Sequence, residues 1–162
     1  MSVTLDILRT YRTPGQVLRR RVTGPPNEPR ALITLMSACI LMFAAQMPGI
    51  TRRAYLDPTL ERDQLMSSAL MGWVFIMPLV FYLIAALSHA VARPFGGKAT
   101  WFEARMALFW ALLAAAPAWL FVGLVQGFLG YGIAHSAVGV LAGVAFLIFW
   151  GAGLREVERG PA

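Results

Sequence analysis

The residues most suggestive of chemistry are the Gly-Gly-Lys-Ala-Thr of positions 96–100, in a polar segment between two apolar runs. A phosphate-binding loop needs a glycine five residues before its Gly-Lys pair, and Ser or Thr directly after the lysine. Here position 92 is alanine, and Ala99 follows Lys98. The loop also follows a long apolar run instead of a short strand. We therefore expect these residues to have a structural role and not to bind a nucleotide.

Other groups capable of catalysis are separated from one another. All eight carboxylates lie outside the apolar runs, which leaves no acid for a proton relay within a membrane. His89 and His135 lie at opposite ends of apolar runs, about 30 Å apart across a bilayer core, so they cannot share a metal. The single cysteine, Cys39, excludes an intrachain disulfide and a Cys-based zinc site. No catalytic residue, metal or cofactor is predicted, and we expect a protein that is not an enzyme.

The composition indicates the class of protein to which these residues belong. Of 162 residues, 58% are apolar and only 14% are charged, which is typical of an integral membrane protein. About 20 apolar residues cross a bilayer as a helix. Four stretches qualify: residues 31–47, 65–91, 106–128 and 133–154. The prediction is an all-α, polytopic bundle of four transmembrane helices over residues 31–154, with a cytoplasmic segment 1–30 and a cytoplasmic tail 155–162.

Basic residues predict the orientation, because short cytoplasmic loops retain Lys and Arg. Eleven basic residues fall before the first span, between the second and third, and after the fourth, whereas three fall in the first loop. Both termini are therefore expected in the cytoplasm. The net charge of +6 is expected to face anionic lipid and not nucleic acid, because the basic residues flank apolar spans.

The segment before the first span is predicted to form two short amphipathic helices on the cytoplasmic face. Apolar residues at helical spacing indicate the first: Val3, Ile7, Leu8 and Tyr11. Thr13 as N-cap and Pro14 at the first helical position mark the second. The apolar side of the second helix is formed by Val17, Leu18 and Val22. Its basic cluster is formed by Arg19, Arg20 and Arg21. Docking on lipid headgroups and a solvated basic end are both compatible with this pattern.

The segment that raised the nucleotide question reads as a helix stop, a turn and a helix start. Arg93-Pro94 ends the second span, and Gly96-Gly97 allows a turn. Thr100 and Glu103 have the spacing of a capping box for the third span. The basic residues of this segment are Arg93, Lys98 and Arg105. Like the N-terminal basic cluster, they are expected to face anionic headgroups.

The same loop carries a family resemblance. The run of residues 96–102, followed by Arg105, Leu108, an Ala-rich stretch and Pro117, resembles the Gly-Gly-x-Gly-(Ser/Thr)-Phe…Pro signature of bacterial Yip1-domain membrane proteins. The proline and basic cluster of residues 13–20 are similar to the helix with which many of them begin. The resemblance implies a polytopic bundle with no established catalytic activity, whose eukaryotic relatives act in vesicle trafficking through protein partners.

Small residues in the last two spans predict where helices approach one another closely. Gly123 and Gly127 form one GxxxG pair, and Gly139 and Gly143 form another. A stripe runs along the fourth span: Gly132, Ser136, Gly139 and Gly143. Because a short turn joins spans three and four, we expect Gly123 and Gly127 to meet Gly132 and Ser136. Gly139 and Gly143 are expected to meet another span or a helix of another protein.

The remaining intramembrane features do not single out a transport path. Gln46 and Gln126 can hydrogen-bond across the bundle or reach interface water. Pro78 and Pro117 free backbone carbonyls near the centres of their spans, as in transporters and in ordinary kinked helices. The predicted function is a scaffold or accessory subunit of a bacterial inner membrane that contacts lipids and a membrane protein partner; the alternative is a small transporter or channel subunit.

Overall fold

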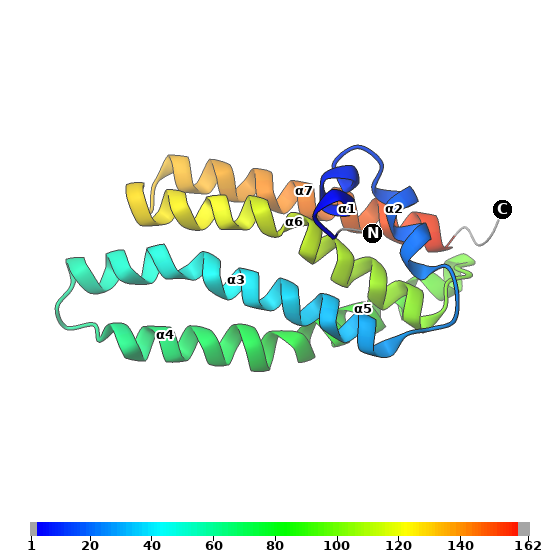
Figure 1. Ribbon diagram of the computed structural model, residues 1–162, viewed down its shortest axis with the longest axis horizontal. Helices are drawn as coiled ribbons and strands as arrows, with labels where there is room; N and C mark the ends of the chain where they lie inside the picture. Colours follow the sequence, from blue (N-terminus) through cyan, green and yellow to red (C-terminus); the bar gives the residue numbers. More distant parts are fainter. Residues whose placement is uncertain (1–2, 159–162) are drawn as a thin grey trace.

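Four long helices dominate the computed structural model, which describes residues 3–158 (Figure 1). Each is long and apolar enough to cross a membrane, as the sequence predicts. The first is α3 (Glu28–Leu56), the third is α6 (Trp101–Leu129) and the fourth is α7 (Ile133–Glu158). The second combines α4 (Arg62–Leu70), a π-helical segment (Met71–Ile76) and α5 (Met77–Ala92). Two short helices, α1 (Val3–Thr10) and α2 (Pro14–Val22), precede them.

The two ends of the bundle differ in what they contain (Figure 1). One end, here the turn end, holds the connections 57–61 and 130–132. The other, here the tail end, holds the loop 93–100 and the last turn of α7.

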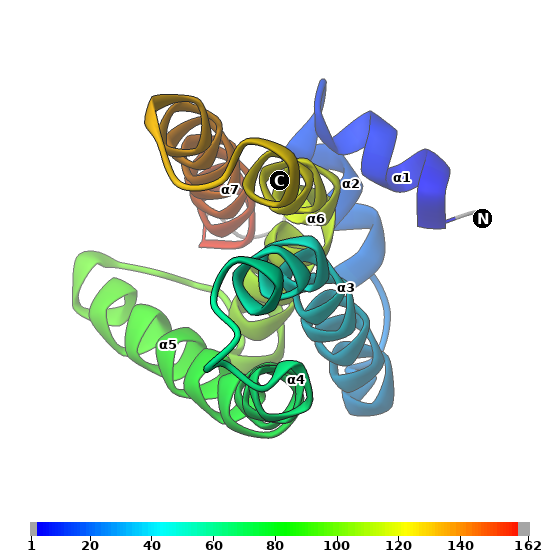
Figure 2. The same cartoon turned by 90° about the vertical axis from the view of Figure 1, so that its left-hand side faces the viewer.

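The helix α6 forms the centre of the bundle. It packs against α3, α5 and α7, and 61% of its most apolar window is buried, compared with 17% for the second and fourth spans. The alanine run at 114–116 is completely buried, and its small side chains allow neighbouring helices to approach. Both α5 and α7 pack against α6, but they make few contacts with each other (Figure 2).

The packing of the GxxxG pair in α6 corrects the prediction. A side chain at Gly123 would collide with the carbonyl of Ala45, and one at Gly127 would collide with Pro48. Both glycines therefore face α3 and not the fourth span. The close contact with α3 is possible because neither glycine has a side chain and because Ala45 is small. Hydropathy in the two helices gives no indication of which neighbour a glycine faces.

Proline has a visible effect in the second span. Pro78 is the second residue after the π-helical segment, and its missing N–H leaves the preceding turn without one helical hydrogen bond. A wider π-helical turn is a common way to accommodate this interruption. In contrast, Pro117 lies inside the continuous helix α6.

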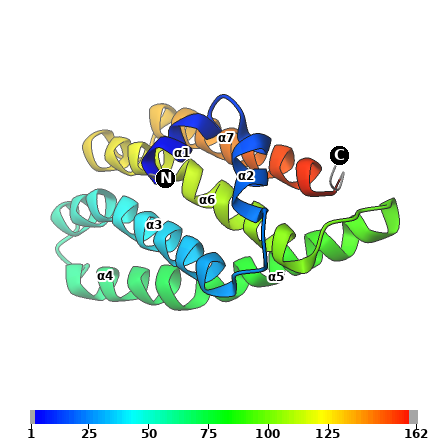
Figure 3. The same cartoon turned by 45° about the vertical axis from the view of Figure 1, so that its right-hand side comes forward.

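The short N-terminal helices form as predicted, but their contacts differ from the prediction (Figure 3). Leu18 of α2 is 1% exposed and packs against Gly153 of α7, and Val17 is also buried. The apolar side of α2 therefore faces the protein and not lipid. Thr13 occupies the N-cap position but makes no capping hydrogen bond, and its hydroxyl instead donates to the carbonyl of Arg9 at 3.4 Å.

Candidate functional site

The glycine-rich loop forms the predicted helix stop, turn and helix start. A short 3-10 turn (Arg93–Phe95) ends the second span, and Gly96 adopts φ +87°, a conformation that favours glycine. The backbone N–H of Glu103 donates to the Thr100 hydroxyl at 3.3 Å, and the Glu103 carboxylate accepts from the Thr100 N–H at 2.6 Å. The capping box is confirmed.

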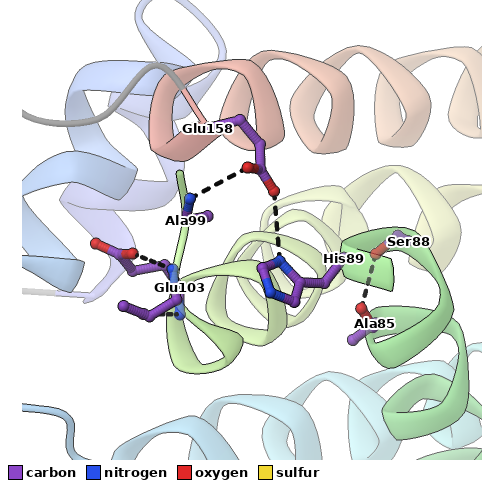
Figure 4. A network of polar contacts seen from close by, with 7 residues as sticks. Ala85, Ser88, His89, Ala99, Glu103 and Glu158 are labelled. Carbon is purple, nitrogen blue, oxygen red and sulfur yellow. Dashed lines mark hydrogen bonds and ion pairs between the residues drawn. The ribbon is translucent and has the colours of Figure 1, made fainter. Parts of the chain in front are cut away.

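The backbone of this loop binds a carboxylate of the chain itself, that of Glu158 (Figure 4). The backbone N–H of Ala99 donates to Glu158 Oε2 at 3.1 Å, and the N–H of Lys98 donates to the Glu158 carbonyl at 3.3 Å. A side chain at Gly97 would collide with the same carboxylate. Because Gly97 has no side chain, the end of α7 can reach the loop backbone. The Lys98 side chain is exposed.

His89 completes this network from α5. Its Nδ1 lies 3.6 Å from Glu158 Oε1, which is ion-pair distance but not a hydrogen bond (Figure 4). Its ring packs edge-on against Trp101, with the ring centroids 4.4 Å apart. The His89 side chain is 4% exposed and that of Glu158 is 14% exposed. The network joins α5, the loop and α7 at the tail end, and its geometry is that of a structural latch. Here we call these contacts the Glu158 latch.

The stripe of small residues on α7 has no close partner in the described bundle. A side chain at Gly132, Gly139 or Gly143 would meet no atom within 4 Å, and Ser136 is exposed. The predicted contact of Gly132 and Ser136 with α6 is therefore wrong. The possible partner of Gly143 remains a prediction.

The open side of α7 faces α5 across two cavities. The tail-end cavity, of about 530 Å³, is almost entirely apolar. Its larger apolar side chains are Ile84, Leu87 and Val91 from α5, and Leu147, Trp150 and Leu154 from α7. The turn-end cavity, of about 500 Å³, lies among α3, α5, α6 and α7 and includes Gly139. At 100° per residue, Gly139, Gly143 and Leu147 share one face of α7, so Gly143 lies between the two cavities.

The comparison with known families gives one result. The Yip1 domain matches residues 8–161, which is almost the whole chain. The chain belongs to the Yip1 family. No curated protein and no solved structure gives a significant match. The resemblance in the sequence is thus confirmed, and it extends from α1 to the end of α7.

The six basic residues predicted to face lipid headgroups divide into two groups in this Yip1 chain. Arg20, Arg93 and Lys98 are exposed. The other three contact side chains of the protein. Arg19 pairs with Glu156 at 3.0 Å, Arg105 pairs with Glu28, and Arg21 is buried. Only the first group is therefore fully available to a headgroup.

Arg21 belongs to a buried cluster that ties α1 and α2 to the centre of the Yip1 bundle. Its Nη2 donates to Asp6 Oδ2 at 2.6 Å, and its guanidinium stacks 3.7 Å from the ring centre of Trp110. The Trp110 indole N–H donates to Thr10 Oγ1 at 3.1 Å, and Thr10 is completely buried. Burial lowers the pKa of Arg21, and the hydrogen bond to Asp6 opposes this change. The lipid assignment of Arg21 is wrong, because its charge is used within the protein.

Two further contacts of the Yip1 bundle were not predicted. Arg52 of α3 donates from Nη1 to the carbonyl of Phe128 at 3.0 Å, and so caps the end of α6. Gly49 leaves room for the amide of Gln126, which a side chain there would displace. The sequence signal for both contacts was weak: Gly49 and Arg52 lie three and six positions after Gln46, near the end of an apolar run.

Proposed function

We propose that this Yip1-family chain is a non-enzymatic accessory subunit or scaffold that holds a transmembrane helix of a membrane protein partner on the open side of α7. The observation that carries the proposal is the stripe at Gly132, Gly139 and Gly143, where added side chains would meet nothing. The GxxxG pair of α6, by comparison, is fully used against α3.

Helix association in a bilayer supports this proposal. Lipid chains are as apolar as leucine side chains, so exposed leucines by themselves do not attract a partner helix. Glycines do so by allowing backbones to approach, and GxxxG pairs favour crossing at about −40°. A helix that crosses α7 at Gly143 would diverge from it on both sides. Its contact would therefore be centred on Gly143 and the neighbouring side of the tail-end cavity.

The proposed setting is a bacterial cytoplasmic membrane, with both termini in the cytoplasm. Support comes from the eleven basic residues assigned to one side and three to the other. Arg20, Arg93 and Lys98 are exposed, which suits contact with anionic headgroups at the cytoplasmic surface.

Gly143→Leu tests the partner contact directly. The tagged full chain is extracted in mild detergent, and the membrane proteins that accompany it are quantified. We expect Gly143→Leu to insert, to keep its thermal unfolding midpoint and to lose one partner selectively. The matched control is Val144→Leu, the next residue, whose side chain is 46% exposed on another face of α7; it should retain the partner.

Two results would contradict the proposal. Loss of thermal stability in Gly143→Leu, with no selective loss of a partner, would place the stripe inside the bundle. Solute flux through the purified chain in vesicles, with no partner needed, would favour the small transporter or channel subunit.

A further inference from the structure

Gln46, Gln126, Tyr131 and His135 are the polar residues of the turn-end cavity, apart from its two tryptophans. Gln126 and Tyr131 line the end nearest the turn, and Gln126 Nε2 donates to Tyr131 Oη at 2.6 Å. His135 lies beside them, with its ring edge-on to Tyr131 at 5.1 Å. Because the Tyr131 oxygen accepts from Gln126, its O–H remains free to donate into the cavity. The imidazole N–H of His135 is a second donor of this kind.

The rest of the cavity is apolar and aromatic. Trp73 and Phe81 contribute from the second span, Trp119 from α6 and Phe146 from α7. The lining continues along α6 from Gln126 to Leu112, which at 1.5 Å per residue is about 20 Å. A volume of about 500 Å³ spread over that length describes a narrow cavity, which suits one chain better than two.

Charge restricts the occupant further. Among the described residues, none that lines this cavity is Asp, Glu, Lys or Arg. Burying a charged headgroup without a countercharge is costly, so an uncharged headgroup fits better. The nearest basic side chains, Arg52 and Arg53, line a separate cleft on the far side of Gln126 and Tyr131.

We propose that the turn-end cavity binds a single-tailed, uncharged membrane lipid of the quinone class. The ring carbonyls accept hydrogen bonds from Tyr131 and His135, the ring packs against the aromatic side chains, and the tail extends along α6. The lipid enters between α5 and α7, which hardly touch each other. This binding site adjoins the partner contact proposed at Gly143, because Gly139 lines the cavity and belongs to the same stripe. The two proposals rest on different observations and are tested by different substitutions.

Two tryptophans in the lining make binding measurable, because quinones quench indole fluorescence. The purified full chain in neutral detergent is titrated with a benzoquinone that carries one isoprenoid unit. We expect saturable quenching, and a Kd about fivefold higher in Tyr131→Phe and in His135→Phe, the equivalent of one ordinary hydrogen bond each. The matched control is Tyr55→Phe, because Tyr55 is 85% exposed and does not line the cavity. Its Kd should equal that of the original chain.

The outcomes separate the alternatives. Equal Kd values in all four proteins would mean that the quinone partitions into detergent, and would overturn the proposal. Displacement of the quinone by an anionic lysophospholipid, lost on substitution of Arg53, would place a charged headgroup in the neighbouring cleft and would also overturn it. Far-ultraviolet circular dichroism confirms that both cavity variants remain folded. Gly143→Leu should leave quinone binding unchanged.

Discussion

Glu158 accepts a hydrogen bond from the backbone N–H of Ala99 at 3.1 Å, which joins two residues 59 positions apart. Through this contact the last turn of α7 closes the loop between the second and third spans. The glycine-rich segment that resembles a phosphate-binding loop therefore binds an anion, but the anion belongs to the chain.

The Glu158 latch predicts different effects for two substitutions. Glu158→Ala removes an acceptor from a mostly buried N–H and should lower the free energy of unfolding by about 2 kcal/mol. Glu158→Gln keeps an oxygen at that position and should lose less. Thermal unfolding in detergent measures both. Glu156→Ala, which removes a partly exposed ion pair with Arg19, is the control and should cost about 0.5 kcal/mol. Equal losses at positions 156 and 158 would contradict the latch.

The structural role of the loop is tested at Thr100 and Lys98. Thr100→Ala removes the observed cap and should lower the free energy of unfolding by about 1 kcal/mol. Lys98→Ala should change it very little, because that side chain is exposed. Binding of radiolabelled ATP at equilibrium tests the alternative. Specific ATP binding that is abolished by Lys98→Ala would contradict the structural role and support a nucleotide-binding loop.

The two sets of glycines predict opposite tolerances. Gly123→Ala places a methyl group against the Ala45 carbonyl and should lower both membrane yield and thermal stability. Gly139→Ala meets nothing within 4 Å and should be neutral or slightly stabilising, because alanine favours helix. The two thermal unfolding midpoints are compared in the same detergent. Similar values for the two variants would contradict the assignment of Gly123 to α3.

The buried pair of Asp6 and Arg21 predicts a non-additive pair of substitutions. Asp6→Ala leaves a buried guanidinium without its carboxylate and should cost about 3 kcal/mol. The double variant Asp6→Ala/Arg21→Met removes both charges and should recover part of that loss. Thermal unfolding is again the measurement, and Asp63→Ala, at an exposed acid, is the control. If the double variant lost the sum of the single effects, α1 and α2 would not be held by this pair.

The orientation is tested by a reporter fused after Ala162 that is active only when exported. We expect no activity, because the basic residues place the tail end in the cytoplasm. Activity would contradict either the orientation or the number of spans.

Local signals predicted the architecture, and contacts between distant residues escaped prediction. The four spans follow from runs of apolar residues, and the start of α6 follows from the Thr100 and Glu103 spacing, because each depends on neighbours in sequence. The partner of Gly123 depends on which helix lies beside α6, and the sequence of α6 carries no information about that. The apolar side of α2 was equally ambiguous, since burial against α7 and burial in lipid select the same residues.

The central position of α6 also bears on the order in which the bundle can assemble. During synthesis the spans enter the membrane one after another from the N-terminus. The chain thus inserts α3 and the second span before α6, the helix that packs against both, has left the ribosome. During that interval the Ala45 and Pro48 surface of α3 lacks the two glycines of α6 that pack against it in the bundle. The Glu158 latch can form only after α7 has been synthesised, because Glu158 lies in the last turn of that helix.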